Sequence, residues 1–184
     1  CSMPYSDIFP DFYGTLSYAP DQIEAYFHVA TCHGFAIACH AIGDEANTIV
    51  LNAAASTHAH GSIEHAQMLK PADIPRFAKL GLTASIQPQH AMDDRDVITR
   101  FWANLGGIPY AFKALHDAGV RLRMGSDAPV APLDPWMAIS AAVFGTESSD
   151  REPFQPEQCL DARTALAAST AVGRDRPEPG DPAD

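Results

Sequence analysis

The sequence has few basic residues. Its 184 residues include 12 Lys and Arg against 23 Asp and Glu, which gives a formal net charge of −11. A protein that binds a phosphate backbone or an anionic membrane surface needs clustered cations. The shortage of basic residues therefore argues against nucleic acids and membranes as partners.

Long hydrophobic runs and paired cysteines are also missing. No apolar run approaches the ~20 residues of a membrane-spanning helix. The first residues, CSMPYSDIFPDFYG, have neither the basic start nor the apolar centre of a signal peptide. The four cysteines show no CxxC spacing, so we expect them to be reduced in a cytoplasmic protein and not to bind zinc.

The apolar share, 46%, is sufficient for a folded core, and the apolar segments alternate in length and spacing. Short apolar runs bounded by glycine or proline predict buried parallel strands. Longer segments that open with proline or aspartate and close with glycine predict helices. The expected strands are 35–40, 61–65, 82–88 and 121–127, and the expected helices are 20–33, one beginning at Asp44, 70–81, 109–120, 132–144 and 161–169.

Strands and helices alternate four times, which is typical of a parallel α/β architecture. Three parts of the chain follow from this pattern. Residues 1–34 form a lead-in segment and a helix, residues 35–170 form the α/β region, and residues 171–184 form a loop-like tail. The polar stretch 89–108 is expected to be a loop.

Polar residues recur where the predicted strands end. His40, His65, Gln87 and Asp127 each close a strand, and the carboxyl ends of parallel strands are where such folds carry their sites. Two imidazoles and a carboxylate suffice for a divalent metal such as zinc. Gln87, with His90 just after it, is better suited to contact with a substrate.

Each of these residues also has a simpler structural explanation. His40 could be a half-buried histidine with satisfied hydrogen bonds, and His65 could belong to a surface loop. Asp127 could cap a turn before a proline. The pair His58 and His60 resembles a metal-binding HxH motif but precedes its strand, so we assign it to a loop.

Other enzyme and binding classes lack their motifs. There is no GxSxG nucleophile elbow around Ser126. No GxGxxG follows a strand, which argues against a dinucleotide fold. A flavodoxin-like binding domain would need phosphate-binding glycines after the first strand, and that turn offers Gly43 alone.

Three long motifs resemble the amidohydrolase superfamily, and most closely its branch of N-substituted formamide deformylase-like enzymes. They are HAIGDEANTIVLNA at 40–53, SIEHAQMLKPADIPRFAKLGLTASIQPQHAMDD at 62–94 and YAFKALHDAGVRLRMGSDAPVAPLDPWMAISAAVF at 110–144. The resemblance implies a distorted (β/α)8 barrel with one or two divalent metal ions, usually zinc. It implies His40 and His65 as metal ligands, and Asp127 as a ligand that also transfers a proton.

The implied activity is hydrolysis of a C–N bond in a small, amide-like, non-peptide substrate by a metal-activated water. The family's first-strand HxH pair and its fourth-strand ligand have no counterpart here. The resemblance therefore implies the carboxyl-terminal half of the barrel, with the fifth to eighth β/α units over residues 35–170.

The first and last strands of such a half-barrel are open edges, which invite pairing with another chain. We therefore expect a homo-oligomer or a separate amino-terminal half as partner. A competing hypothesis is a non-catalytic fragment or remnant that oligomerises through these edges.

Overall fold

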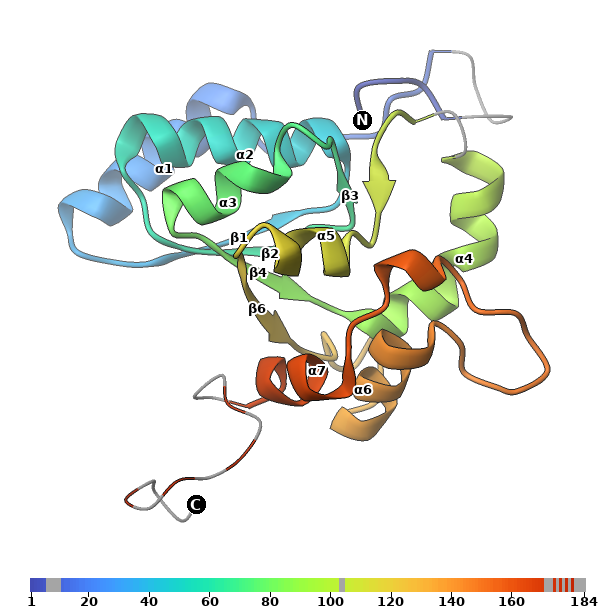
Figure 1. Ribbon diagram of the computed structural model, residues 1–184. Helices are drawn as coiled ribbons and strands as arrows, with labels where there is room; N and C mark the ends of the chain where they lie inside the picture. Colours follow the sequence, from blue (N-terminus) through green and yellow to red (C-terminus); the bar gives the residue numbers. More distant parts are fainter. Residues whose placement is uncertain are drawn as a thin grey trace.

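The computed structural model describes residues 1–5, 11–102, 105–170, 174, 176, 178 and 180 (Figure 1). Four strands form one parallel sheet in the order β1-β2-β4-β6. They are β1 (Ile37–Ala41), β2 (Gly61–His65), β4 (Thr83–Ile86) and β6 (Arg121–Met124). This confirms the predicted α/β class: successive parallel β/α units form part of a (β/α)8 barrel.

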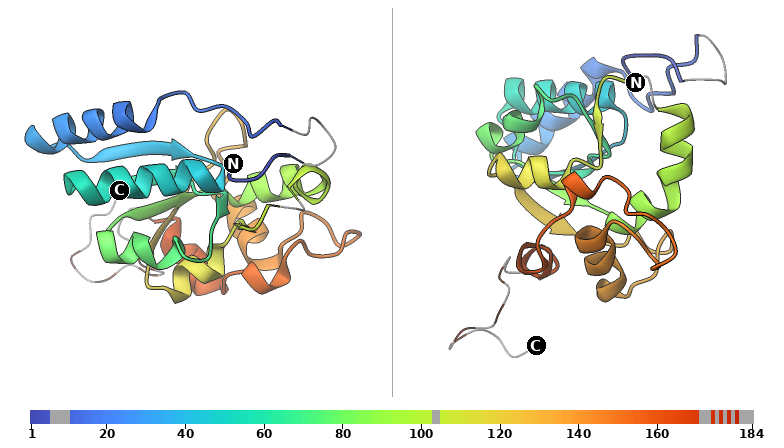
Figure 2. Two further views of the ribbon diagram at one scale, coloured as in Figure 1. Left: turned by 90° about the horizontal axis from the view of Figure 1, so that it is seen from above. Right: turned by 45° about the vertical axis from the view of Figure 1, so that its right-hand side comes forward.

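Helices connect the strands of the sheet (Figure 2). They are α1 (Pro20–Cys32), α2 (Asp44–Thr57), α3 (Ile74–Leu80), α4 (Pro88–Phe101), α5 (Phe112–Asp117), α6 (Pro135–Phe144), the 3-10 helix η1 (Pro156–Gln158) and α7 (Ala162–Ala168). Within the described residues, no helix is long and apolar enough to cross a lipid bilayer.

The two faces of the sheet differ in character because side chains alternate along each strand. One in-register row is apolar and packs against α2, α3, α5 and α7: Cys39, Ile63, Ala84 and Leu122. We call this the covered face. The next row is polar and half-buried to exposed: His40, Glu64, Ser85 and Arg123. We call this the open face.

A close contact fixes the register between β1 and β2. Gly61 pairs with Ile37 and has a φ of +141°, outside the range that side-chain-bearing residues normally adopt. A Cβ at Gly61 would lie only 2.0 Å from the Ile37 carbonyl oxygen. Only glycine can stand there without moving one strand away from the other.

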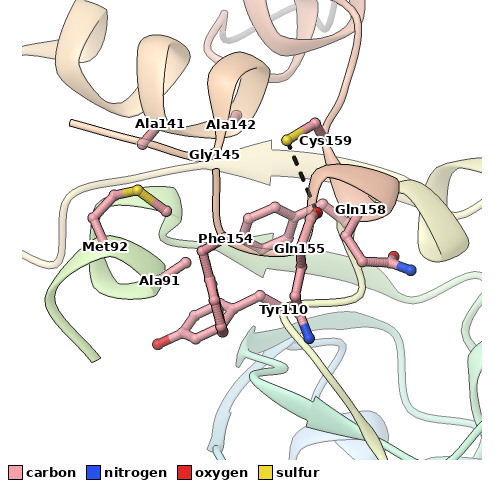
Figure 3. A pocket seen from close by; sticks show the side chains of 11 residues that line it. Ala91, Met92, Tyr110, Ala141, Ala142, Gly145, Phe154, Gln155, Gln158 and Cys159 are labelled. Atoms are coloured by element: carbon pink, nitrogen blue, oxygen red, sulfur yellow. Dashed lines mark hydrogen bonds between the residues drawn. The ribbon is translucent and has the colours of Figure 1, made fainter. Parts of the chain in front are cut away.

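Helices α4 and α6 pack against each other beside the segment that includes η1 (Figure 3). The cavity between them has a volume of about 10 Å³ and is lined mainly by small and apolar groups, including Ala91, Met92, Ala141 and Ala142. A cavity of this size holds one water molecule at most. The start of α4 is therefore tightly packed against α6.

A much larger cleft, of about 890 Å³, runs along the outer edge of β1. It is bounded by residues 13–18, α1, β1 and α2. In the described part of the chain β1 pairs only with β2, and β6 pairs only with β4. The two predicted open edges are thus present.

Three local predictions were wrong. Residues 89–108 were expected to form a loop, but most of them lie in α4, which opens with Pro88. The helix predicted over 70–81 begins only at Ile74. Pro109 lies in a strand, not at a helix start: β3 (Met68–Leu69) and β5 (Ile108–Pro109) form an additional antiparallel pair. The predicted tail, 171–184, lies largely outside the described residues.

Candidate metal centre

Three potential metal ligands meet beyond the carboxyl ends of three neighbouring strands. His65 ends β2, His90 lies in the first turn of α4 directly after β4, and Asp127 follows β6. One ligand atom from each residue lies within 4.8 Å of the other two. The His65 Nε2 atom is 3.9 Å from Asp127 Oδ2.

His40 stands next to this group. The centroid of its ring is 4.5 Å from that of His65, and the His65 ring is 5.8 Å from that of His90. The structure therefore brings together two of the three predicted ligands, His65 and Asp127, with the third, His40, beside them. His90, which we predicted to contact substrate, is one of the three clustered donors.

The donors differ in exposure. His65 and His90 are 8% and 7% exposed, whereas the Asp127 side chain is 45% exposed. His65 Nδ1 and His90 Nε2 are both buried and accept or donate no hydrogen bond within the described structure. A buried polar atom without a partner costs about 1–3 kcal/mol. Two imidazoles and a carboxylate so close together are a donor set that fits a metal of the zinc type.

The protonation state of His65 also favours metal binding. Burial lowers the pKa of the His65 imidazole, and the neighbouring His40 lowers it further, against an opposing effect from Asp127. The neutral imidazole is the form that binds a metal. Near pH 7 His65 is therefore ready to act as a ligand.

The backbone is unusual at two of the ligands. His65 and the following Ala66 have φ angles of +73° and +46°, and Asp127 has a φ of +53°. Side-chain-bearing residues rarely adopt this left-handed region, and such residues cluster at functional sites. The left-handed pair after β2 is fixed by Ala66 N–H, which donates to Ala41 O at 3.1 Å.

Asn47, in α2, anchors the turn that follows His40. The fully buried Asn47 amide nitrogen lies within hydrogen-bond distance of the carbonyl oxygens of residues 41, 42, 43 and 68, at 2.9–3.3 Å. It thus ties the end of β1 to β3. Nothing in the sequence distinguishes Asn47 from the other polar residues of α2, such as Thr48 and Asn52.

The remaining predicted residues also have definite places. Gln87 is buried, its amide nitrogen donates to Ser85 O at 3.3 Å, and its Oε1 atom has no partner within the described structure. It remains a candidate for substrate contact. His58 and His60 lie between α2 and β2, at the opposite ends of the strands from the three donors.

Comparison with known proteins identifies the family. A family model described as the amidohydrolase family matches residues 2–174. Two relatives are the protein LONG AFTER FAR-RED 3 of Arabidopsis thaliana, 32% identical over 88% of this chain, and the putative amidohydrolase YtcJ of Bacillus subtilis (strain 168), 30% identical over 91%. Among solved structures, an uncharacterised metal-dependent hydrolase from Pyrococcus horikoshii OT3 superimposes with a TM-score of 0.81 and 29% identity over 94% of this chain.

The chain spans about one third of the length of these proteins. It covers 29% of the Arabidopsis protein, 33% of the Bacillus protein and 35% of the Pyrococcus chain. The comparisons establish the superfamily recognised in the motifs and do not distinguish the formamide deformylase-like branch within it.

Proposed function

This chain belongs to the amidohydrolase family, and from that premise we propose that it carries the metal-binding region of a metal-dependent hydrolase. The observation that carries this proposal is the cluster of His65, His90 and Asp127, in which both imidazoles are buried. His40 is the fourth candidate ligand because its ring stands against that of His65.

The proposed cofactor is a divalent metal, with zinc favoured because two or three of the donors are imidazoles. A bound ion of this kind supplies Lewis-acid polarisation of a carbonyl and a lowered pKa for water. His65 and His90 would hold it from β2 and α4. The more exposed Asp127 would complete the set from the segment after β6.

The proposed reaction is hydrolysis of a C–N bond in a small, amide-like, non-peptide substrate. The motifs that resemble formamide deformylase-like enzymes support this substrate class. Asp127 has the exposure needed to reach a water molecule, accept its proton and return that proton to a leaving nitrogen. Gln87, through its unpaired Oε1, would contact the substrate beside it.

The first test is the metal content of the purified protein, without a histidine tag and after dialysis against metal-free buffer, by plasma mass spectrometry. We expect about one ion per chain, and loss of this ion in His65→Ala and in His90→Ala. His33→Ala is the matched control because His33 is exposed at the end of α1. Absence of retained metal in the unsubstituted protein would contradict the proposal.

The substrate class is tested separately. Small N-substituted formamides and related amides should be cleaved by the metal-loaded protein, and cleavage should be lost in Asp127→Asn. Metal binding without any hydrolysis would favour the non-catalytic alternative. That alternative draws on the open edges of β1 and β6, which suit association with another copy or with a separate barrel half.

The partner is tested by size-exclusion chromatography with light scattering. We propose that the edge of β1 is covered in the working protein, because exposed aromatic and aliphatic residues surround the cleft beside it: Tyr13, Leu16, Tyr18 and Tyr26. A stable monomer with no tendency to associate would argue against this.

A further inference from the structure

Three polar side chains outside the donor cluster form a hydrogen-bonded unit between the elements that carry His65 and His90. Tyr110 donates its hydroxyl hydrogen to Asp94 Oδ2 at 2.8 Å. Gln67 donates from Nε2 to the same oxygen at 3.1 Å and to the Tyr110 hydroxyl oxygen. We call Gln67, Tyr110 and Asp94 the clamp.

Two of the clamp residues are close in sequence to the donors. Gln67 is two residues after His65, just beyond the left-handed Ala66. Asp94 is four residues after His90 in α4, so it lies on the same side of that helix one turn further along. A bond between Gln67 and Asp94 therefore fixes the distance between the two histidine-bearing segments.

The small antiparallel sheet brings Tyr110 to the other two. Gln67 immediately precedes β3, and Tyr110 immediately follows β5. The Tyr110 N–H donates to Gln67 O at 2.6 Å, which continues the ladder formed by β3 and β5. Tyr110 itself has a left-handed φ of +48° and is 2% exposed. The phenol is thus directed by the backbone toward the gap between Gln67 and α4.

The Tyr110 hydroxyl is the hydrogen-bond donor to Asp94 in the clamp. Burial, together with the Asp94 carboxylate, raises the pKa of the Tyr110 hydroxyl far above its usual range. The hydroxyl therefore stays protonated near neutral pH and can donate its hydrogen bond to Asp94 Oδ2. A buried hydrogen bond to a carboxylate is also stronger than one between neutral groups.

We propose that Gln67, Tyr110 and Asp94 are positioning residues that hold the His65 turn against the first turn of α4, so that the His65 and His90 nitrogens point at one metal ion. This inference rests on the proposed function, and it assigns to these three residues the role of outer support for the metal ligands. None of the three belongs to the donor cluster itself.

The test compares Tyr110→Phe and Asp94→Leu with the unsubstituted protein. Zinc affinity, measured by competition with a chromophoric chelator, should fall about tenfold or more, as it does when outer partners of metal ligands are removed. Asp94→Asn keeps an acceptor oxygen and should restore most of the affinity. Asp117→Leu is the matched control for Asp94→Leu, because Asp117 is an exposed carboxylate at the end of α5.

A second measurement does not depend on the metal. In metal-free protein, the nitrogen-correlated NMR signals of the His65 and His90 rings should shift or broaden in Tyr110→Phe, while those of the exposed His33 stay unchanged. Gln67→Met provides a further variant should Asp94→Leu fail to fold. Thermal unfolding of each variant separates a loss of stability from a loss of ligand placement.

The outcomes separate the two proposals. If the unsubstituted protein binds no zinc but the ring signals respond to Tyr110→Phe, the positioning role stands and the hydrolase proposal fails. If zinc binds with equal affinity to folded Tyr110→Phe and Asp94→Leu, and the ring signals are unchanged, the positioning role is overturned while the metal site remains. Unchanged ring signals without any zinc binding would overturn both.

Discussion

The covered face and the open face of the same sheet differ in composition and in burial. The covered row, which includes the fully buried Ile63, packs against helices and is dry. The open row ends in the exposed His40 at one edge and the exposed Arg123 at the other. Parallel sheets normally have both faces covered. The contrast indicates that folding energy comes from one face, whereas the other can carry polar groups that serve a site.

The largest expected effect tests this division within one strand. Ile86 and Ser85 are consecutive in β4 and therefore belong to opposite faces; Ile86 is fully buried and Ser85 is not. Ile86→Ala should lower the free energy of unfolding by about 2–5 kcal/mol. Ser85→Ala should change it by less than about 0.5 kcal/mol. Urea denaturation of both variants measures the difference. Equal losses of stability would contradict the division of roles between the two faces.

A smaller effect is expected at Asn47, a polar group on the helix side of β1. Its amide nitrogen contacts the carbonyl oxygens of residues 41–43 and 68. Asn47→Ala leaves buried carbonyls without a donor, so the free energy of unfolding should fall by about 1–3 kcal/mol. The turn after His40 should also exchange its amide hydrogens faster. Hydrogen exchange that stays slow at residues 41–43 would speak against the anchoring role.

The smallest effect on stability concerns His65, at the carboxyl end of β2. Burial holds the folded pKa of His65 below the value of about 6.5 for an unfolded histidine. Between these two pKa values the unfolded chain binds more protons, so stability falls as the pH is lowered from about 6.5 toward the folded pKa. In chelator-treated protein, His65→Gln should reduce this pH dependence. The same slope in both proteins would show that His65 is not a source of it.

Much of the fold follows directly from the sequence. The predicted strand 61–65 is β2 residue for residue, because a glycine opens it and a polar histidine ends it. Helix α1 begins at Pro20 as predicted, since proline is favoured in the first turn. In these elements local preference and tertiary packing agree.

The errors arose where local patterns conflicted with packing. The charged residues 93–96 obscure the apolar periodicity of α4 in the sequence. The helix nevertheless buries Ala91, Met92 and Ile98. The strands β3 and β5 have two residues each, which is too short for an alternation of apolar and polar residues to predict them. Both depend on pairing between distant segments, which a single sequence does not display.

The candidate site also depends on pairing between distant segments. We predicted metal binding at His65 and Asp127 because each stands at the end of a predicted strand, and substrate contact at His90 because it follows Gln87. Its place among the donors depends on α4 beginning at Pro88, which turns His90 toward His65. The roles of Gln67 and Tyr110 depend on the β3–β5 pair and were not visible in the sequence.

The left-handed residues have a consequence for any effort to make this protein more robust. Among the described residues, six without glycine's freedom have a positive φ, and four of them are His65, Ala66, Tyr110 and Asp127. Each such residue costs about 1–3 kcal/mol, so selection for heat resistance alone would first replace them. Ala66→Gly would relax the chain at the point where rigidity aligns the ligands. Substitutions that raise the thermostability of this protein at these positions are therefore expected to weaken the alignment of its metal ligands.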